Sequence, residues 1–230
     1  MNTGYVSSLP VSQVDAETRS TFITRTYLHL LGAILAFVAI EVFLFQSGLA
    51  ESIARTMFQF SWLIILGLFM LVGWLATHLA SNTASKAAQY GGLALYVVVE
   101  ALIFVPLLYL AMSYEPRVIN SAAQVTLLGF GALTAVAFMT RKDFSFLRGI
   151  LFWGFILAIV AIVAAAIFGF NLGTFFSVAM VGLAGAAILY DTSNVIHHYP
   201  EDRYVGAALQ LFASVALMFW YVLSIFMSRD

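Results

Sequence analysis

Long apolar stretches alternate with short polar segments along almost the whole chain. Seven of these stretches have about 18 residues or more, the length that a helix needs to cross a bilayer. We predict spans near residues 27–46, 60–80, 90–112, 121–140, 147–169, 172–191 and 204–227. The connections are short and contain most of the charged residues. The pattern therefore predicts an all-α membrane protein with seven transmembrane helices in one bundle.

The beginning of the chain is more polar than the rest. Residues 1–26 lack an apolar core and contain Asp15, Glu17 and Arg19, so they do not have the pattern of a cleaved signal peptide. We expect a polar cytoplasmic N-terminal tail over residues 1–26, followed by the transmembrane bundle over residues 27–230.

The composition supports a membrane location. Of the 230 residues, 63% are hydrophobic and 9% are charged, whereas soluble proteins carry about 25% charged residues. The 10 Lys and Arg residues nearly balance the 11 Asp and Glu residues, so the net charge does not point to any charged partner. We expect the lipid bilayer and no nucleic acid as a partner. The chain has no cysteine, which excludes disulfides, iron–sulfur clusters and thiol nucleophiles.

The basic residues predict how the chain is oriented. If the N-terminus lies inside, the cytoplasmic segments hold Arg19, Arg25, Lys86, Arg141, Lys142, Arg148 and Arg203, and the opposite segments hold Arg55, Arg117 and Arg229. Positively charged loops stay in the cytoplasm. We therefore predict a cytoplasmic N-terminus and, after an odd number of spans, a C-terminus on the other side.

Three carboxylates lie within or at the edge of the predicted spans, where an ionisable group costs at least about 2.5 kcal/mol. Glu100 is in the middle of the third span, and Pro106 favours a kink beside it. Asp191 ends the sixth span, where a negative charge opposes the helix dipole. Both are candidates for proton sensing or cation binding, although Asp191 could equally be an interfacial acid. Glu41 is either a third candidate or a carboxylate that snorkels to water.

The histidines are weaker candidates. His29 and His78 are single polar residues near predicted helix ends, and we expect them to make structural hydrogen bonds. His197 and His198 precede Glu201–Asp202, and this loop is either solvated or a site for a divalent ion.

Small residues four apart predict close helix contacts. The pairs are Gly131 and Ala135, Ala161 and Ala165, and Gly182 and Ala186.

The motifs of known seven-helix enzymes and receptors do not occur. Both lysines, Lys86 and Lys142, lie in predicted connections, so none can carry a buried retinal. Residues 182–185, GLAG, have alanine where an intramembrane serine nucleophile would stand, and the last span has no histidine for zinc. We expect no enzymatic activity, no cofactor and no metal site, apart from Ca²⁺ as an ion that the protein could transport or sense.

Three segments together resemble the Bax inhibitor-1 family of seven-helix proteins, specifically its bacterial YccA-like branch. They are residues 140–149, TRKDFSFLRG; residues 190–197, YDTSNVIH; and Glu100–Ala101 followed by Pro106. The resemblance implies six helices around a central last helix. It also implies a proton-sensitive calcium leak gated by two aspartates on the last two helices.

The first aspartate of that pair corresponds to Asp191, but Ser214 stands where the second is expected. Two close carboxylates can share a proton, whereas an aspartate and a serine cannot titrate as such a pair. The YccA-like branch also has serine there, and its family role is to bind and moderate a membrane-anchored AAA protease.

The resemblance thus implies a bacterial inner (plasma) membrane protein that modulates such a protease, with a proton-sensitive cation leak centred on Asp191 and Glu100 as the alternative. Because these proteases engage flexible ends, the tail residues Asp15, Glu17 and Arg19 are the candidate protease contacts.

Overall fold

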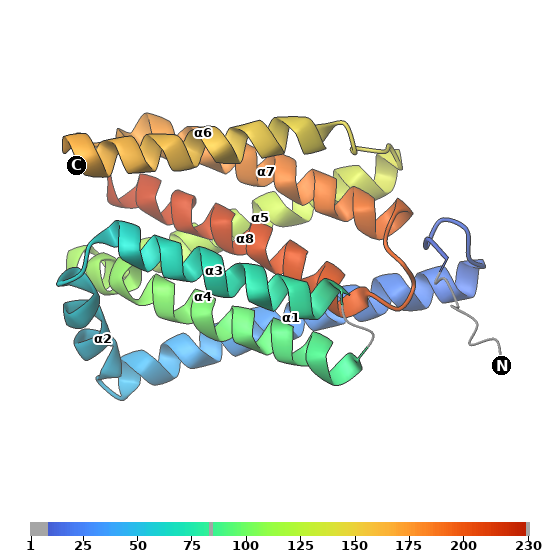
Figure 1. The fold of residues 1–230 in the computed structure, drawn as a ribbon, viewed down its shortest axis with the longest axis horizontal. Helices are drawn as coiled ribbons and strands as arrows, with labels where there is room; N and C mark the ends of the chain where they lie inside the picture. Colours follow the sequence, from blue (N-terminus) through green and yellow to red (C-terminus); the bar gives the residue numbers. More distant parts are fainter. Residues whose placement is uncertain (1–8, 83–84, 229–230) are drawn as a thin grey trace.

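The structure, a computed structural model, describes residues 9–82 and 85–228, and within them it is helical with no named strand (Figure 1). The helices are α1 (Ala16–Gln46), α2 (Leu49–Phe58), α3 (Trp62–Asn82), α4 (Lys86–Tyr114), α5 (Arg117–Thr140), α6 (Leu147–Phe168), α7 (Gly173–His197) and α8 (Tyr204–Met227). All except α2 are long and apolar enough to cross a membrane, which confirms the predicted fold class. We call the end of the bundle where α1 begins the tail end, and the other the α2 end.

Two differences from the predicted elements matter for the site. The first helix begins at Ala16 rather than near residue 27, because the Asp15 carboxylate caps it by accepting from the Glu17 and Thr18 amides. Part of the predicted tail is therefore a helical extension of the first span, and residues 1–8 lie outside the described residues. The short helix α2 was predicted as a connection. It is amphipathic, with Ala50 and Ala54 on its buried side, and it is too short to span.

The last helix is central, as the resemblance predicts. Half of the most apolar 18-residue stretch of α8 is buried inside the protein. The helix packs against α1, α3, α4, α5 and α7. The helix α6 is the one spanning helix in the described part of the chain that does not pack on α8; it packs on α7 and α3 instead. Only 11% of its most apolar 18-residue stretch is buried. A cavity described below separates α6 from α8.

Glycine allows the closest helix contacts, but not where the spacing predicts them. A Cβ atom on Gly92 of α4 would lie 2.5 Å from the Ala76 carbonyl oxygen and 2.7 Å from the Ala80 amide nitrogen of α3. By contrast, a Cβ atom on Gly131 or Gly182 would meet nothing within 4 Å. The predicted close contacts at these two glycines are therefore wrong, since their faces of α5 and α7 do not touch a neighbouring helix.

The basic residues that we predicted to be cytoplasmic all lie at or near helix ends, at the tail end of the bundle. They are Arg19, Arg25, Lys86, Arg141, Lys142, Arg148 and Arg203. Arg55 and Arg117 lie at the α2 end, and Arg229 is outside the described residues. The clustering is what a cytoplasmic tail end requires, although the orientation itself stays a prediction.

Replacing Gly92 tests the α3–α4 contact. Gly92→Ala forces two helix backbones apart, so we expect a loss of about 1–3 kcal/mol in the free energy of unfolding. Thermal unfolding of the detergent-solubilised protein measures it. The neighbouring Gly91→Ala is the control, because a Cβ atom there meets nothing within 4 Å and alanine favours a helix. Equal stability of the two variants would contradict the contact.

Candidate functional site

Asp191 of α7 and Ser214 of α8 are joined by a hydrogen bond. The Ser214 hydroxyl donates to Asp191 Oδ2 over 2.6 Å, and Ser214 is buried. These are the two positions that the resemblance singles out, and the packing of α7 along α8 brings them together. The structure therefore pairs one carboxylate with one hydroxyl, while what the pair does stays a prediction.

Asp191 does not lie at a helix end as the sequence suggested. The helix α7 continues to His197, so Asp191 is more than one turn from its end. The unfavourable effect of a helix dipole is confined to the last turn. Burial between helices, and not the dipole, is therefore what sets the surroundings of this carboxylate.

Hydroxyl groups from α1, α5 and α7 gather near Asp191. The Tyr27 hydroxyl of α1 lies beside those of Thr134 and Thr192, within electrostatic reach of Asp191. None of these three buried hydroxyls has a hydrogen-bond partner among the described residues. Beyond the end of α7, burial and then the charge of Asp191 raise the pKa of the Tyr199 phenol. Hydroxyls both donate and accept, so the Ser214 hydroxyl, which contacts Asp191, can pair with the carboxyl group in either protonation state.

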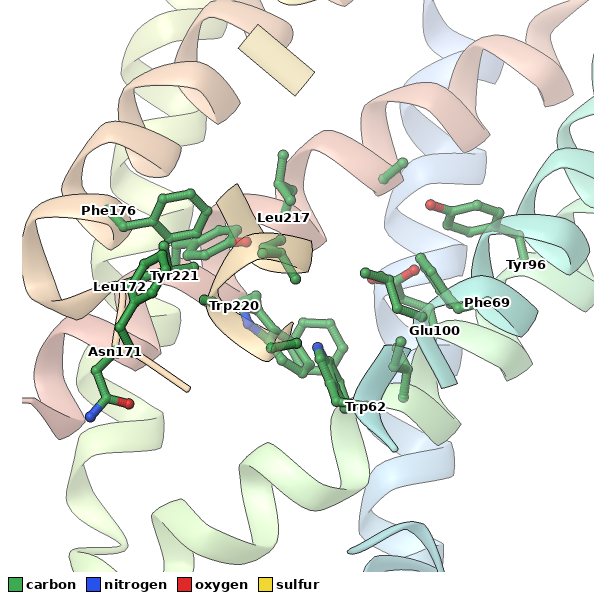
Figure 2. Close-up of a pocket in the computed structure, with 18 residues that line it drawn as sticks. Trp62, Phe69, Tyr96, Glu100, Asn171, Leu172, Phe176, Leu217, Trp220 and Tyr221 are labelled. Carbon is green, nitrogen blue, oxygen red and sulfur yellow. The ribbon is translucent and has the colours of Figure 1, made fainter. Parts of the chain in front are cut away.

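Glu100 lines a cavity of about 520 Å³ that is bordered by α3, α4, α6, α7, α8 and the α6–α7 connection. It is 6% exposed, hydrogen-bonds with the Tyr96 side chain one turn earlier in α4, and leaves its Oε2 without a partner. Figure 2 shows Glu100 and Tyr96 facing a space that Trp220 and Tyr221 bound on the other side. Glu100 therefore faces a cavity in mid-span, and does not snorkel.

Aromatic side chains form much of the wall of this cavity, which we call the Glu100 cavity. Trp62 at the start of α3 stacks on Trp220 of α8, with ring centroids 5.8 Å apart, and Asn171 of the α6–α7 connection completes the wall at the α2 end. No motif in the sequence singled out these residues. They come from distant parts of the chain, and a tryptophan near a helix end is ordinary in a membrane protein.

Glu41 lies in another part of the bundle. It is 7% exposed, so of its two interpretations the carboxylate that snorkels to water is wrong. It lines a separate cavity with residues of α1, α4, α5 and α8. The structure does not bring the three candidate carboxylates together, because neither Asp191 nor Glu41 is among the residues that line the Glu100 cavity.

Two of the histidines make hydrogen bonds with side chains from distant parts of the chain. His29 contacts the Tyr90 hydroxyl at 3.0 Å, as predicted. His198 contacts Asp143 at 3.0 Å. Hydrogen bonds from Ser145 and from His198 lower the pKa of the Asp143 carboxyl group. Among the described residues, no three His, Cys, Asp or Glu side chains lie close enough to hold a metal ion. The loop after His197 therefore does not form the divalent-ion site that was one of its two interpretations.

The N-terminal segment at residues 9–15, which we call the strap, lies against the α7–α8 loop. Val11 is fully buried, and its amide donates to the Tyr199 carbonyl over 2.8 Å. Arg19 holds the strap from α1 by donating to the carbonyls of Val11 and Ser12 at 3.1 and 2.8 Å. Of the three predicted protease contacts, Asp15 and Arg19 are thus engaged within the chain, and Glu17 is exposed.

The comparisons with known proteins agree with the motifs. The model of the family described as "Inhibitor of apoptosis-promoting Bax1" matches residues 19–230. "Uncharacterized protein PA2604" of Pseudomonas aeruginosa is 36% identical over 120 residues, which cover 52% of this chain and 54% of that protein. "Modulator of FtsH protease YccA" of Escherichia coli K12 is 36% identical over 116 residues, covering 49% and 52%.

More distant relatives are eukaryotic. "Bax inhibitor 1" of Oryza sativa is 26% identical over 163 residues, covering 69% of this chain and 66% of that protein. The chain spans about half the length of the bacterial relatives that it matches. The family model, however, covers nearly the whole chain, together with both motifs and the central last helix. This protein is therefore a multi-pass membrane protein that belongs to the Bax inhibitor-1 family.

Proposed function

We propose that this protein is a non-enzymatic modulator of a membrane-anchored AAA protease in a bacterial inner membrane. The observation that carries the proposal is the likeness to a relative named as a modulator of the FtsH protease, 36% identical over about half of each chain. A second relative is named as an inner membrane protein. The lipid bilayer and the protease complex are then the partners of the chain.

The Asp191–Ser214 pair supports this function over a two-aspartate sensor. In the structure Ser214 donates to Asp191, so the group at this second position is a hydroxyl and not a carboxylate that could share a proton. Among the described residues, no other acidic side chain makes a contact of this kind with Asp191. A protein of this family with such a pair is better suited to a regulatory role than to proton-gated conduction.

The tail end offers the protease a surface and a segment to engage. It carries the cluster of basic residues and, under the positive-inside rule, faces the cytoplasm. Glu17 is exposed there, beside the strap that is held down by Arg19. A protease that pulls on flexible ends must first release the strap from Tyr199, and this contact then limits how fast the chain itself is degraded.

Association with the protease is the first test. We expect the tagged chain to co-purify with the membrane AAA protease of its host, and deletion of its gene to speed the turnover of membrane substrates of that protease. Removing residues 1–14, which leaves the Asp15 cap in place, should change this effect or the turnover of the chain itself. If neither changes, the tail has no part in the mechanism; if the chain neither co-purifies nor alters turnover, the proposed function is wrong.

Arg19→Ala tests the strap. It removes two hydrogen bonds from a charged donor, together worth about 1–2 kcal/mol at a partly exposed site. We expect about tenfold faster hydrogen exchange at the Val11 amide and a shorter cellular half-life of the chain. Arg148→Ala is the matched control, because Arg148 is exposed at the same end. Faster exchange at Val11 with an unchanged half-life would show that release of the strap does not limit degradation.

The second candidate function is a proton-sensitive cation leak that involves Asp191 and Glu100. The observation in its favour is that Glu100 faces a cavity in mid-span with one carboxylate oxygen unpartnered. Intramembrane acids of this kind mark ion and proton pathways in many membrane proteins. Ca²⁺ is the ion that the family resemblance implies.

Calcium flux into liposomes separates the two functions. If the chain is a leak, flux should depend on pH between about 5 and 8, and Asp191→Asn should shift that dependence. Ser214→Asp should make it steeper, because two carboxylates then titrate as a coupled pair. Glu51→Gln, at an exposed site on α2, is the control. No flux above empty liposomes at any pH in this range would rule out the leak.

A further inference from the structure

A second cavity, of about 400 Å³, lies between α1 and α5 with α8 as its floor. We call it the Glu41 cavity. In the described part of the chain, side chains of α1 and α5 meet toward the tail end, where the ring centroids of Tyr27 and Phe138 lie 5.8 Å apart. The two backbones do not pack closely, and at the level of Glu41 a gap remains between the helices. The residues that line the gap on its outer side include Val38, Val42 and Leu127, which are 48%, 47% and 52% exposed. The cavity therefore opens sideways, toward lipid.

The polar groups inside the Glu41 cavity lack partners. Neither oxygen of Glu41 accepts or donates a hydrogen bond among the described residues, and the same holds for the Thr126 hydroxyl. Both side chains are more than nine-tenths buried, with 7% and 2% of each residue exposed. Glu41 alone of the described lining residues carries a charge. A carboxylate buried in apolar surroundings is costly unless a donor or a cation reaches it.

The position of Glu41 along the helix restricts what can reach it. It lies five residues before the end of α1 at Gln46, which is about 7 Å along the helix axis. Asn120 lines the same cavity and belongs to the first turn of α5, at the same end of the bundle. Glu41 is thus close to the depth at which lipid headgroups meet the acyl chains. Apart from Glu41, Asn120 and Thr126 the wall is apolar, with Phe37, Phe212 and Phe219 among its residues.

We propose that the Glu41 cavity binds a membrane lipid whose headgroup ends in a primary ammonium group. The ammonium donates to both oxygens of Glu41 and supplies the opposite charge, while the Asn120 amide can donate to the phosphate nearer the membrane surface. An acyl chain then lies against the apolar wall between α1 and α5. A hydrated metal ion fits poorly, because it needs several oxygen ligands and the cavity offers a single carboxylate. The proposal does not depend on the protease function.

Defined lipids test this site on the unaltered chain. We expect native mass spectrometry of the purified protein to retain phosphatidylethanolamine more strongly than phosphatidylcholine of the same acyl chains, and more strongly than phosphatidylglycerol. Phosphatidylcholine carries the same positive charge but has no N–H to donate. Equal retention of the three lipids would overturn the proposal, and because this comparison needs no variant, it stands even if a substitution prevents folding.

A substitution locates the preference at Glu41. Glu41→Gln should weaken binding of phosphatidylethanolamine about tenfold, the size of one charge-assisted hydrogen bond, and leave phosphatidylcholine binding unchanged. Glu100→Gln is the matched control, since it removes a buried carboxyl group from the other cavity and should keep the lipid preference. If Glu41→Gln keeps the preference, or if Glu100→Gln loses it equally, the ammonium does not bind at Glu41.

Discussion

Polar groups placed within the bilayer must be satisfied by the protein or by what it binds, since the hydrocarbon core supplies no hydrogen bonds. This constraint explains the interior of the bundle better than any single contact does. The central helix α8 brings Ser214 to Asp191, and α4 places Tyr96 beside Glu100. Glu41 has no such neighbour among the described residues. The three carboxylates thus differ in how many of their hydrogen bonds the chain itself supplies. Asp191 is paired with Ser214, whereas Glu100 and Glu41 each leave at least one oxygen without a partner in a cavity.

The tail end connects the pair to the surface. The strap contacts Tyr199 in the loop that joins α7 to α8, and Tyr199 senses the charge of Asp191, which contributes to raising its pKa. The segment that a protease would grip therefore rests on the loop between the two helices that carry Asp191 and Ser214.

The sequence predicted much of the fold because lipid imposes a simple pattern. Seven apolar stretches became seven spans, and the segments at residues 140–149 and 190–197 identified the family. The start of α1 was misplaced because polar residues outside the bilayer still form a helix when Asp15 caps it. The short helix α2 was missed, since ten residues give a weak periodic signal. Close contacts were misplaced at Gly131 because small residues allow an approach but do not say which faces meet.

The candidate site was predictable in its residues but not in its surroundings. Isolated acids in apolar stretches singled out Glu100 and Asp191, and the resemblance added Ser214. Nothing in one sequence indicated that Trp62 and Trp220 stack at the edge of the Glu100 cavity, because those residues are far apart along the chain. Nor could polarity show that the strap is bound to the α7–α8 loop rather than free, since apolar residues such as Val11 alternate there with polar ones over only seven residues.

Regulation of a protease can be measured with purified components in proteoliposomes. The quantity to measure is the rate at which a membrane AAA protease degrades a membrane substrate, with and without an equal amount of this chain. We expect slower degradation, with the same number of ATP molecules hydrolysed for each substrate degraded. The reason is that the chain limits access of the substrate to the protease and does not alter ATP hydrolysis or peptide cleavage. An unchanged degradation rate at every ratio of chain to protease would contradict a regulatory role.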